Sequence, residues 1–312
     1  MPTSNSRRRG VLAPFDPWKS PLCTCPFKLS LNPYTGCSFK CVYCYATAYI
    51  GLRDSEPKRD FIRRLRRDLA RWRPPAIVNL GTSSDPYPPI EQFYKLTRAA
   101  LELLVPLGYR ILITTKGTLY AKRDLDIIAR GNVAVTPTIT TLDDSVALLV
   151  EPGAPPPQSR IDAVRAATTA GVPVGVRVDP IIPYFNDDPA MLKELVGKLY
   201  DAGARFIVTS TFKARPDSMA RFKSMGGAGL RLYKLYRESG VKVGGYLYLP
   251  KKAREEMLRP VIEEAARLGM EYATCREGLT GREWFNAGSC DGSHLIPFRV
   301  KPRVRGLEEW AR

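Results

Sequence analysis

The sequence predicts an α/β fold, a partial to full parallel (β/α) barrel with N- and C-terminal extensions. Short runs rich in β-branched residues alternate with stretches of helical periodicity. Gly or Pro separates most of these runs, as in VPLGY and TAGVP. A long series of such units in one direction favours a barrel over an open sheet, and 312 residues are enough to build one.

Strands and helices alternate along most of the chain. The first predicted strand is at 27–36, and the others are at 76–82, 109–115, 133–140, 173–182, 205–211, 242–249 and 270–275. The predicted helices are at 58–73, 91–104, 159–170, 189–202 and 251–268. We therefore expect an irregular extension at 1–26, a barrel core at 27–250 and a C-terminal extension at 251–312.

Polar residues follow several of these strands. The sequences GTSSDP, TTKGT, TPTITT, VDPIIP and TSTF stand where the strands end. In a parallel barrel these ends share one mouth, which is where the chemistry occurs. Turn residues of the same kinds are also common in ordinary connections, so this signal alone is weak.

The chain is strongly basic, with 48 Lys and Arg against 31 Asp and Glu and a net charge of +17. This favours a polyanionic partner, RNA or DNA, although a solvated basic surface is the alternative. The sequence has no apolar run of about 18 residues and no secretion signal, so we expect no membrane partner and a cytoplasmic location. Few Asn and Gln beside 27 Pro suggest an archaeal hyperthermophile.

Three cysteines lie close together in GCSFKCVYCYA, residues 36–46. Cys37, Cys41 and Cys44 have the spacing C-x3-C-x2-C, and thiolates select zinc or iron–sulfur clusters. A zinc site needs a fourth ligand nearby, and the single histidine, His294, is far along the chain. Three cysteines therefore favour a 4Fe–4S cluster with one open iron, with a structural zinc knuckle as the alternative.

This motif after the first strand of a barrel resembles the radical S-adenosylmethionine (SAM) superfamily. The stretches NPYTGCSFKCVYCYA, GTSSDPYPPIE, ITTKGTLYAKRDLDII and GVPVGVRVDPIIP make it similar to the family related to spore photoproduct lyase, over residues 25–250. The resemblance implies that SAM chelates the open iron. An electron from a donor such as ferredoxin then cleaves SAM to methionine and a 5′-deoxyadenosyl radical, which abstracts hydrogen from the substrate.

The resemblance also implies roles for individual residues. Cys37, Cys41 and Cys44 would ligate the cluster. Tyr45 would back the adenine, and Ser84 would hydrogen-bond the methionine end of SAM. Lys116 would pair with its carboxylate, for which a compact cation is suited. The other expected cofactor-binding residues are Tyr43, Asp85, Thr138 or Thr140 at the ribose, Arg177, Val178 and Ile181.

One position departs from the family pattern. Spore photoproduct lyase has a cysteine in the turn after its second strand, which returns a hydrogen atom to the product radical. Ser83 stands at the matching position here, and a serine O–H bond is too strong for that role. We therefore do not expect spore photoproduct cleavage.

Four further cysteines lie outside the loop, namely Cys23, Cys25, Cys275 and Cys290. In a barrel the first and last elements are neighbours, so these thiols could meet. Four thiolates suit a second iron–sulfur cluster or a zinc site, and His294 could replace one of them. Disulfides and unrelated free thiols are the alternatives.

The stretch KRDFIRRLRRDLARWR, 58–73, predicts an amphipathic helix with a strongly basic face. Such a face suits phosphate backbones. Alternatively, it is a solvated helix in which Asp60 and Asp68 pair locally. The candidate nucleic-acid-binding residues are Arg63, Arg64, Arg66, Arg67 and Arg71.

Three functions are consistent with these features. The first is a radical SAM enzyme, of lyase or transferase type, that modifies or repairs a nucleic-acid base. The second keeps this chemistry but acts on a protein or peptide. The third is a nucleic-acid-binding module with a structural metal cluster and no turnover.

Overall fold

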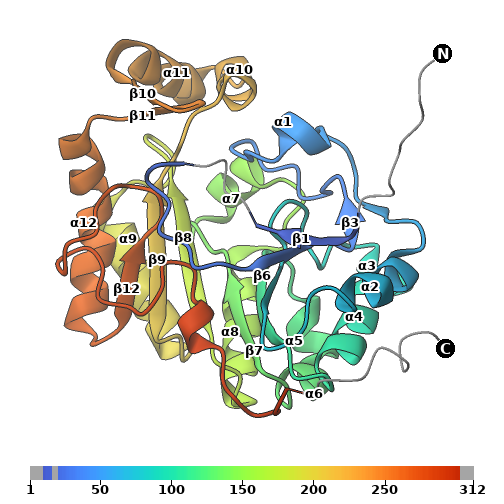
Figure 1. The fold of residues 1–312 in the computed structure, drawn as a ribbon. Helices are drawn as coiled ribbons and strands as arrows, with labels where there is room; N and C mark the ends of the chain where they lie inside the picture. Colours follow the sequence, from blue (N-terminus) through green and yellow to red (C-terminus); the bar gives the residue numbers. More distant parts are fainter. Residues whose placement is uncertain (1–9, 16–19, 303–312) are drawn as a thin grey trace, which may run out of the picture.

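The computed structural model describes residues 10–15 and 20–302, and a curved parallel sheet forms its centre (Figure 1). The parallel strands are β2 (Leu29–Leu31), β5 (Ile77–Leu80), β6 (Arg110–Thr115), β7 (Val133–Pro137), β8 (Gly175–Ile181), β9 (Phe206–Thr211) and β12 (Glu271–Thr274). Pairing runs from β2 through β5 and β6 to β7, and from β8 through β9 to β12. Two isolated bridges join β7 to the β8 segment, Val135 to Val174 and Thr138 to Arg177.

The sheet is an incomplete barrel. Within residues 10–15 and 20–302, no backbone pairing connects β12 to β2. On its other side β2 pairs antiparallel with β1 (Leu12–Pro14), which ends this part of the sheet. The α/β class and the partial parallel barrel predicted from the sequence are therefore confirmed.

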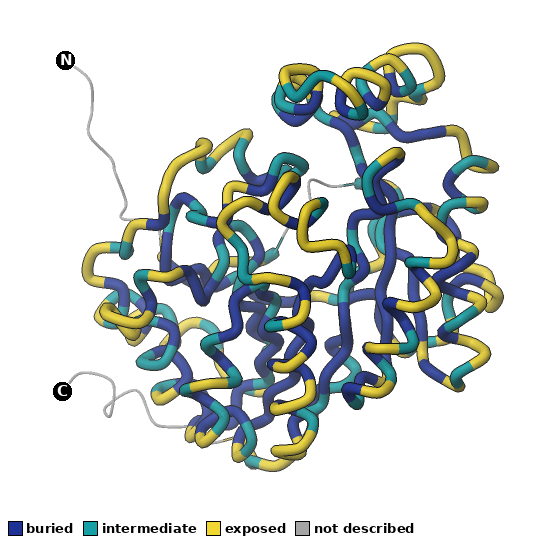
Figure 2. Tube along the Cα trace, turned by 180° about the vertical axis from the view of Figure 1, so that it is seen from behind, coloured by how far each residue is buried: buried dark blue, intermediate teal, exposed yellow. Residues whose placement is uncertain are grey.

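Helices cover the outer face of the sheet, and the strands lie in the buried interior (Figure 2). They are α2 (Phe61–Leu69), α3 (Glu91–Tyr94), α4 (Leu96–Leu104), α5 (Leu119–Arg123), α6 (Leu125–Ile128), α7 (Asp144–Val150), α8 (Pro157–Thr169), α9 (Pro189–Asp201) and α12 (Lys251–Arg267). The predicted helix at 91–104 is two helices, because Lys95 adopts a left-handed backbone with φ 50°. No helix in the described part of the chain is long and apolar enough to cross a bilayer.

The predicted strand at 242–249 is not part of the barrel. It forms a hairpin of β10 (Val241–Val243) and β11 (Tyr246–Tyr248), because Gly244 has a positive φ of 58° and permits a tight turn. With α10 (Pro216–Ser224) and α11 (Gly227–Ser239), this hairpin stands above the ends of β8 and β9 (Figure 1).

Both predicted extensions contribute a strand to the central sheet. β1 lies within 1–26, where we expected irregular chain, and β12 lies within 251–312, where the sequence predicts a strand at 270–275. Residues 1–9, 16–19 and 303–312 lie outside the described chain. The boundaries at 26 and 250 remain a prediction.

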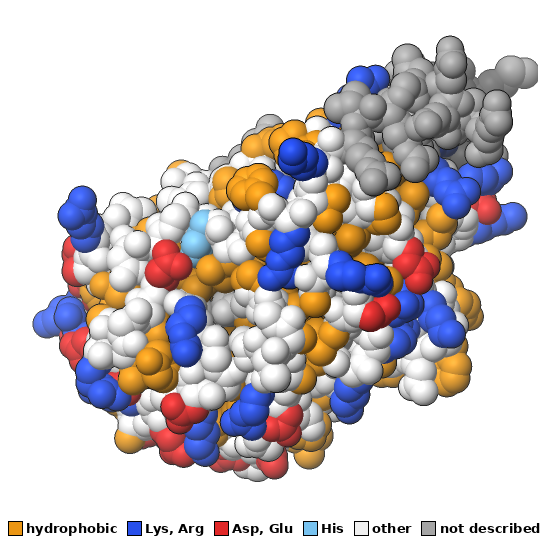
Figure 3. Space-filling view, turned by 90° about the horizontal axis from the view of Figure 1, so that it is seen from below, with side chains coloured by type: hydrophobic (Ala, Val, Ile, Leu, Met, Phe, Trp, Pro, Cys, Tyr) orange, Lys and Arg blue, Asp and Glu red, His pale blue; other side chains and the backbone are white. Residues whose placement is uncertain are grey.

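The segment after β12 folds back into the barrel from its lower end. Ile296 packs on Leu112 and Ala134, and Cys290 packs on Phe206 and Val208. A short 3₁₀ helix, η1 (Ser293–Leu295), lies in this segment. Around it, the lower face of the molecule carries basic and acidic side chains interspersed (Figure 3).

A buried ion pair ties α7 to α8. The Arg160 guanidinium donates to the Glu151 carboxylate, and their side chains are 2% and 0% exposed. Arg160 also donates to the carbonyl oxygens of Pro155 at 2.7 Å and Thr138 at 3.2 Å. Removing one partner would leave the other charge buried and unpaired.

We predict that Glu151→Ala lowers the free energy of unfolding by about 3–5 kcal/mol, because the Arg160 charge loses its partner. Chemical denaturation measures this loss. The matched control is Asp162→Ala at the exposed pair with Arg165, 3.5 Å apart, which should change stability by less than about 1 kcal/mol. Equal losses in the two variants would contradict the prediction.

Candidate active site

The three-cysteine loop lies between two short elements at the top of the barrel. It follows β3 (Tyr34–Thr35), which pairs with β4 (Glu56–Pro57), and it precedes α1 (Thr47–Ile50). Gly36 opens the loop with φ 70°, and a Cβ there would lie 2.1 Å from the Asp54 carbonyl oxygen. Only glycine fits this turn, which places Cys37 against the backbone of Arg53, N to O 2.9 Å.

Contacts from distant elements hold the loop in place. The Val42 N–H donates to the carbonyl oxygen of Val150 at 2.9 Å. From α10, the Arg221 guanidinium donates to the carbonyl oxygens of Val42 at 2.8 Å and Cys44 at 3.1 Å. The loop therefore depends on the barrel and on the α10–α11 segment together.

All three thiols of the loop line one cavity at the barrel mouth. Burial raises the pKa of the Cys37 thiol to about 11 and also raises the pKa of Cys41, so ligand binding there requires proton release. In the described part of the chain, no three Cys, His, Asp or Glu side chains surround a single ion. Thiols are nevertheless the donors that iron–sulfur clusters take, and the three that line this cavity fit such a group by their chemistry.

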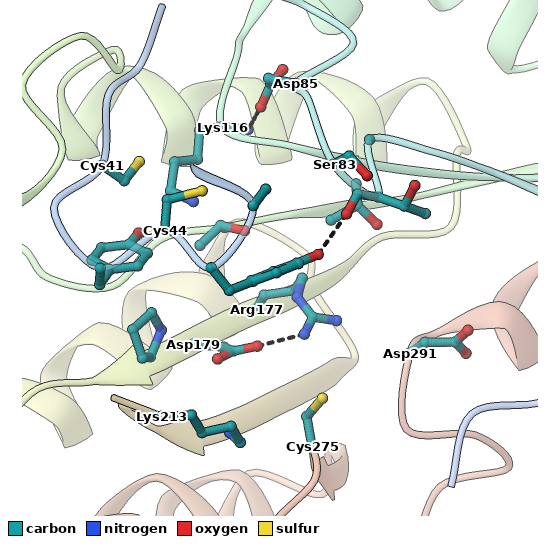
Figure 4. A pocket seen from close by; sticks show the side chains of 18 of the residues that line it. Cys41, Cys44, Ser83, Asp85, Lys116, Arg177, Asp179, Lys213, Cys275 and Asp291 are labelled. Carbon is teal, nitrogen blue, oxygen red and sulfur yellow. Dashed lines mark hydrogen bonds and ion pairs between the residues drawn. The ribbon is translucent and has the colours of Figure 1, made fainter. Parts of the chain in front are cut away.

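Lys116 is a cation without a carboxylate partner. It follows β6 and lies beside Cys41 and Cys44 (Figure 4). Its Nζ is 5.3 Å from the centroid of the Tyr43 ring, and among residues 10–15 and 20–302 no carboxylate lies within ion-pair distance of it. A carboxylate bound in this cavity would find a free ammonium here.

Ser84 and Asp85, predicted in the turn after β5, hold neighbouring backbone segments in place. The Ser84 hydroxyl donates to the Gly36 carbonyl oxygen, so it anchors the cysteine loop. Asp85 accepts from the Lys116 N–H at 2.7 Å and from the Thr115 hydroxyl at 2.6 Å. Both side chains line the cavity, but these bonds occupy the Ser84 hydroxyl and hold the Asp85 carboxylate.

Two predicted aromatic residues also line the cavity. The Tyr45 hydroxyl donates to the carbonyl oxygen of Thr82, which fixes the ring beside Cys44. The Tyr43 hydroxyl donates to Glu151 and points away from the cavity. The ring of Tyr43, not its hydroxyl, is therefore available to a ligand.

The residues predicted on β7 and β8 divide into two groups. Thr138 and Arg177 line the cavity, and Arg177 pairs with Asp179 at 2.5 Å. Thr140 does not line it, because its hydroxyl donates to Glu151 at 3.2 Å. Val178 and Ile181 are also absent from the lining, since both are fully buried in the barrel core.

Several cavity residues escaped the sequence analysis. Two of them are Asp179 and Lys213, which lie across the cavity from Cys44 in Figure 4. Lys213 directly follows the polar strand end TSTF, and this position could have predicted it as a cavity residue. Its ammonium pairs with the Glu277 carboxylate at 3.0 Å. Tyr246 and Arg276 also line the cavity, but no pattern in the sequence joins them.

The structure brings the other four cysteines together. The Sγ atoms of Cys25 and Cys290 are 3.6 Å apart, and all four thiols are free. Hydrogen bonds from Cys23 and Cys290 and the charge of Lys28 lower the pKa of Cys25 to about 3. Cys23, Cys25 and Cys275 line the same cavity as the three-cysteine loop.

His294 does not join this group of thiols. Its Nδ1 is 2.8 Å from the Ser289 hydroxyl, and its Nε2 is 3.3 Å from the Glu271 carboxylate. Both ring nitrogens have polar neighbours within the C-terminal half, so His294 is a loop histidine here. The alternative, in which His294 replaces a thiolate, stays a prediction.

The basic helix α2 lies on the flank of the barrel, away from the mouth (Figure 1). Phe61, Leu65 and Leu69 are buried, as the helical spacing predicts. A surface groove beside it is lined by Arg59, Asp60, Arg63, Arg64 and Arg67. Asp60 pairs with Arg63 at 2.8 Å, but most predicted arginines are exposed, namely Arg63, Arg66, Arg67 and Arg71.

Comparisons with known proteins agree with this site. The model of the radical SAM superfamily matches residues 31–196. An uncharacterised protein of Mycobacterium tuberculosis is 31% identical over 244 residues, which are 68% of this chain and 71% of that protein. A radical SAM Nalpha-GlyT isomerase of Pseudomonas phage M6 is 25% identical over 294 residues, which are 86% of this chain and 60% of the isomerase.

A solved structure shares the fold. Spore photoproduct lyase complexed with dinucleoside spore photoproduct aligns with a TM-score of 0.59 and 15% identity, over 86% of this chain and 79% of that chain. The family match covers more than half of the chain and includes the three-cysteine loop, β5 to β8 and Lys116. The chain belongs to the radical SAM superfamily.

Proposed function

We propose that this radical SAM enzyme holds a 4Fe–4S cluster on Cys37, Cys41 and Cys44 and acts on a base of a nucleic acid. The observation that carries the proposal is one cavity that joins three thiols to the unpaired ammonium of Lys116. Thiolates would ligate the cluster, and the ammonium would hold the carboxylate of SAM. Neither group needs to break an existing ion pair to do so.

The chain's own residues would orient the bound groups. When bound, the cluster and SAM supply a radical that takes a hydrogen atom from carbon. The ring of Tyr45 and the side chain of Thr138 form part of the cavity wall and would position the nucleoside end of SAM. An external donor such as ferredoxin would supply the electron.

A nucleic-acid substrate is supported by charge. The net charge is +17, and α2 exposes several arginines. The segment 215–242 above the mouth carries seven Lys and Arg against Asp217 and Glu238. Spore photoproduct lyase, which shares the fold, is seen with a dinucleoside ligand. A protein or peptide substrate is the alternative, and salt-independent substrate binding would favour it.

We also propose that Cys23, Cys25, Cys275 and Cys290 hold a second iron–sulfur cluster. Three of these thiols line the cavity, and the Lys28 ammonium is 3.7 Å from Cys25 Sγ, where it would offset thiolate charge. Zinc and a Cys25–Cys290 disulfide are the competing outcomes.

Cys37→Ala should abolish formation of 5′-deoxyadenosine from SAM under dithionite, because the cluster loses one of three ligands. Anaerobically reconstituted protein and chromatography of the products check this. Circular dichroism shows whether the variant is folded. Full cleavage by a folded variant would sink the cluster assignment, and no cleavage by the unaltered protein would favour a binding module without turnover.

Lys116→Ala should raise the KM for SAM by about tenfold or more, because the carboxylate of SAM would lose a hydrogen bond to a charged group. The initial rate of 5′-deoxyadenosine formation against SAM concentration measures it. The matched control is Lys122→Ala, an exposed lysine on α5 that should leave KM unchanged. An unchanged KM in Lys116→Ala would show that the carboxylate binds elsewhere.

The double variant Cys25→Ser with Cys290→Ser should contain less iron and sulfide than the unaltered protein, while the EPR signal of the first cluster persists. Metal analysis after anaerobic reconstitution gives both quantities. Unchanged iron would rule out the second cluster. Zinc bound to the unaltered protein would also rule out the second cluster and would show that these thiols hold zinc instead. A mass of the unaltered protein that is lower by two hydrogens would show that they form a disulfide.

A further inference from the structure

Arg276 has an unusual backbone and an unpartnered side chain. It follows Cys275 at the end of the β12 segment and adopts a left-handed conformation with φ 58°. Residues other than glycine rarely adopt this conformation, and such residues cluster at functional sites. Its Nε and Nη2 atoms are buried and have no hydrogen-bond partner among the described residues.

A tyrosine and a second arginine lie against Arg276. The Tyr246 ring centroid is 4.5 Å from the guanidinium carbon of Arg276 and 5.0 Å from that of Arg215. The Tyr246 hydroxyl and Arg215 Nε are likewise buried without a hydrogen-bond partner among the described residues. Arg276, two residues past β12, and Arg215, just before α10, thus both lie against the ring of Tyr246 on β11.

Little negative charge balances these two arginines. No carboxylate in the described part of the chain lies within 4.0 Å of Arg276, and the nearest to Arg215 is Asp217 at 3.8 Å. Buried donors without acceptors cost free energy, so an anion bound here would supply what is missing. The free Nε and Nη2 edge is the part of a guanidinium that binds phosphate or carboxylate through two hydrogen bonds.

We propose that Arg276, with Tyr246 and Arg215, binds a backbone phosphate of a single-stranded nucleic acid whose target base enters the cavity. The proposal rests on the proposed function and names its substrate class. Arg276 and Tyr246 line the same cavity as the three-cysteine loop. A phosphate held there leaves the adjoining nucleotide within the cavity, as enzymes that act on an extruded base require.

The neighbouring surface favours phosphate over the carboxylate of a peptide. Helix α10 begins directly after Arg215 and α11 begins at Gly227, and together they expose Lys223, Arg231, Lys234 and Arg237. A polynucleotide presents one anion per nucleotide and can contact a row of cations, whereas an ordinary peptide cannot. On the opposite face, basic and acidic side chains are interspersed (Figure 3).

The test is binding of a fluorescent single-stranded DNA oligonucleotide by the reconstituted holoenzyme, followed by anisotropy at several salt concentrations. Arg276→Ala should weaken binding by about tenfold or more. The slope of log affinity against log salt should fall by about 0.7, the share of one phosphate on a single strand. Arg276→Lys keeps the positive charge but loses the paired N–H donors of the guanidinium. This variant should therefore bind the oligonucleotide with intermediate affinity and an unchanged salt dependence.

The matched control is Arg267→Ala, which removes the same charge from an exposed pair with Glu264 on α12 and should bind normally. An equal loss in this control, or normal binding by Arg276→Ala, would overturn the proposal. If polyglutamate competes as strongly as the unlabelled oligonucleotide, the site does not prefer phosphate over carboxylate, and that part of the proposal falls.

Formation of 5′-deoxyadenosine by the unaltered protein tests the proposed function separately. If the unaltered protein cleaves SAM but Arg276→Ala binds normally, the proposed function stands and the phosphate site falls. If the unaltered protein does not cleave SAM but oligonucleotide binding depends on Arg276, the phosphate site stands and the proposed function falls.

Discussion

One buried carboxylate, that of Glu151, fixes the position of the three-cysteine loop on the barrel. It accepts hydrogen bonds from Arg160 on α8, from Thr140 after β7 and from Tyr43 within the loop. Burial alone would raise the pKa of Glu151, but the charges of Arg160 and Lys116 outweigh it and lower the pKa. The carboxylate therefore stays ionised, and the ion pair that stabilises the barrel also holds the three-cysteine loop in place.

The cavity contains two kinds of cation. Arg177 and Lys213 are paired with carboxylates and act as parts of the wall. Lys116 and Arg276 contact aromatic rings and have no carboxylate partner among the described residues. An anion that reaches an unpaired cation in a partly buried cavity is bound more strongly than at the surface. In the assignment proposed above, Lys116 would hold the carboxylate of the cofactor and Arg276 the phosphate of a substrate.

The incomplete barrel explains why two groups of cysteines share one cavity. β2 and β12 are not paired to each other, and the segment after β12 fills the space between them. The buried pair of Lys28 with Asp291 joins this segment to the start of the first parallel strand. Chain ends that are far apart in sequence therefore meet beside the mouth. A metal group held by the second set of thiols would face the same space as the SAM cluster.

The sequence by itself determined the βα order, the three-cysteine loop and the amphipathic helices, because each depends on local periodicity or local spacing. It also placed Lys116 at the end of a strand, where a parallel barrel gathers its site. Only the tertiary structure decided that the hairpin at 241–248 leaves the barrel and that Thr140 and Ile181 turn away from the cavity. It alone brought Tyr246 to Arg276, and Cys25 to Cys290 at 3.6 Å. These pairs are separated by long stretches of chain, and their contacts arise from packing between elements, for which no local pattern codes.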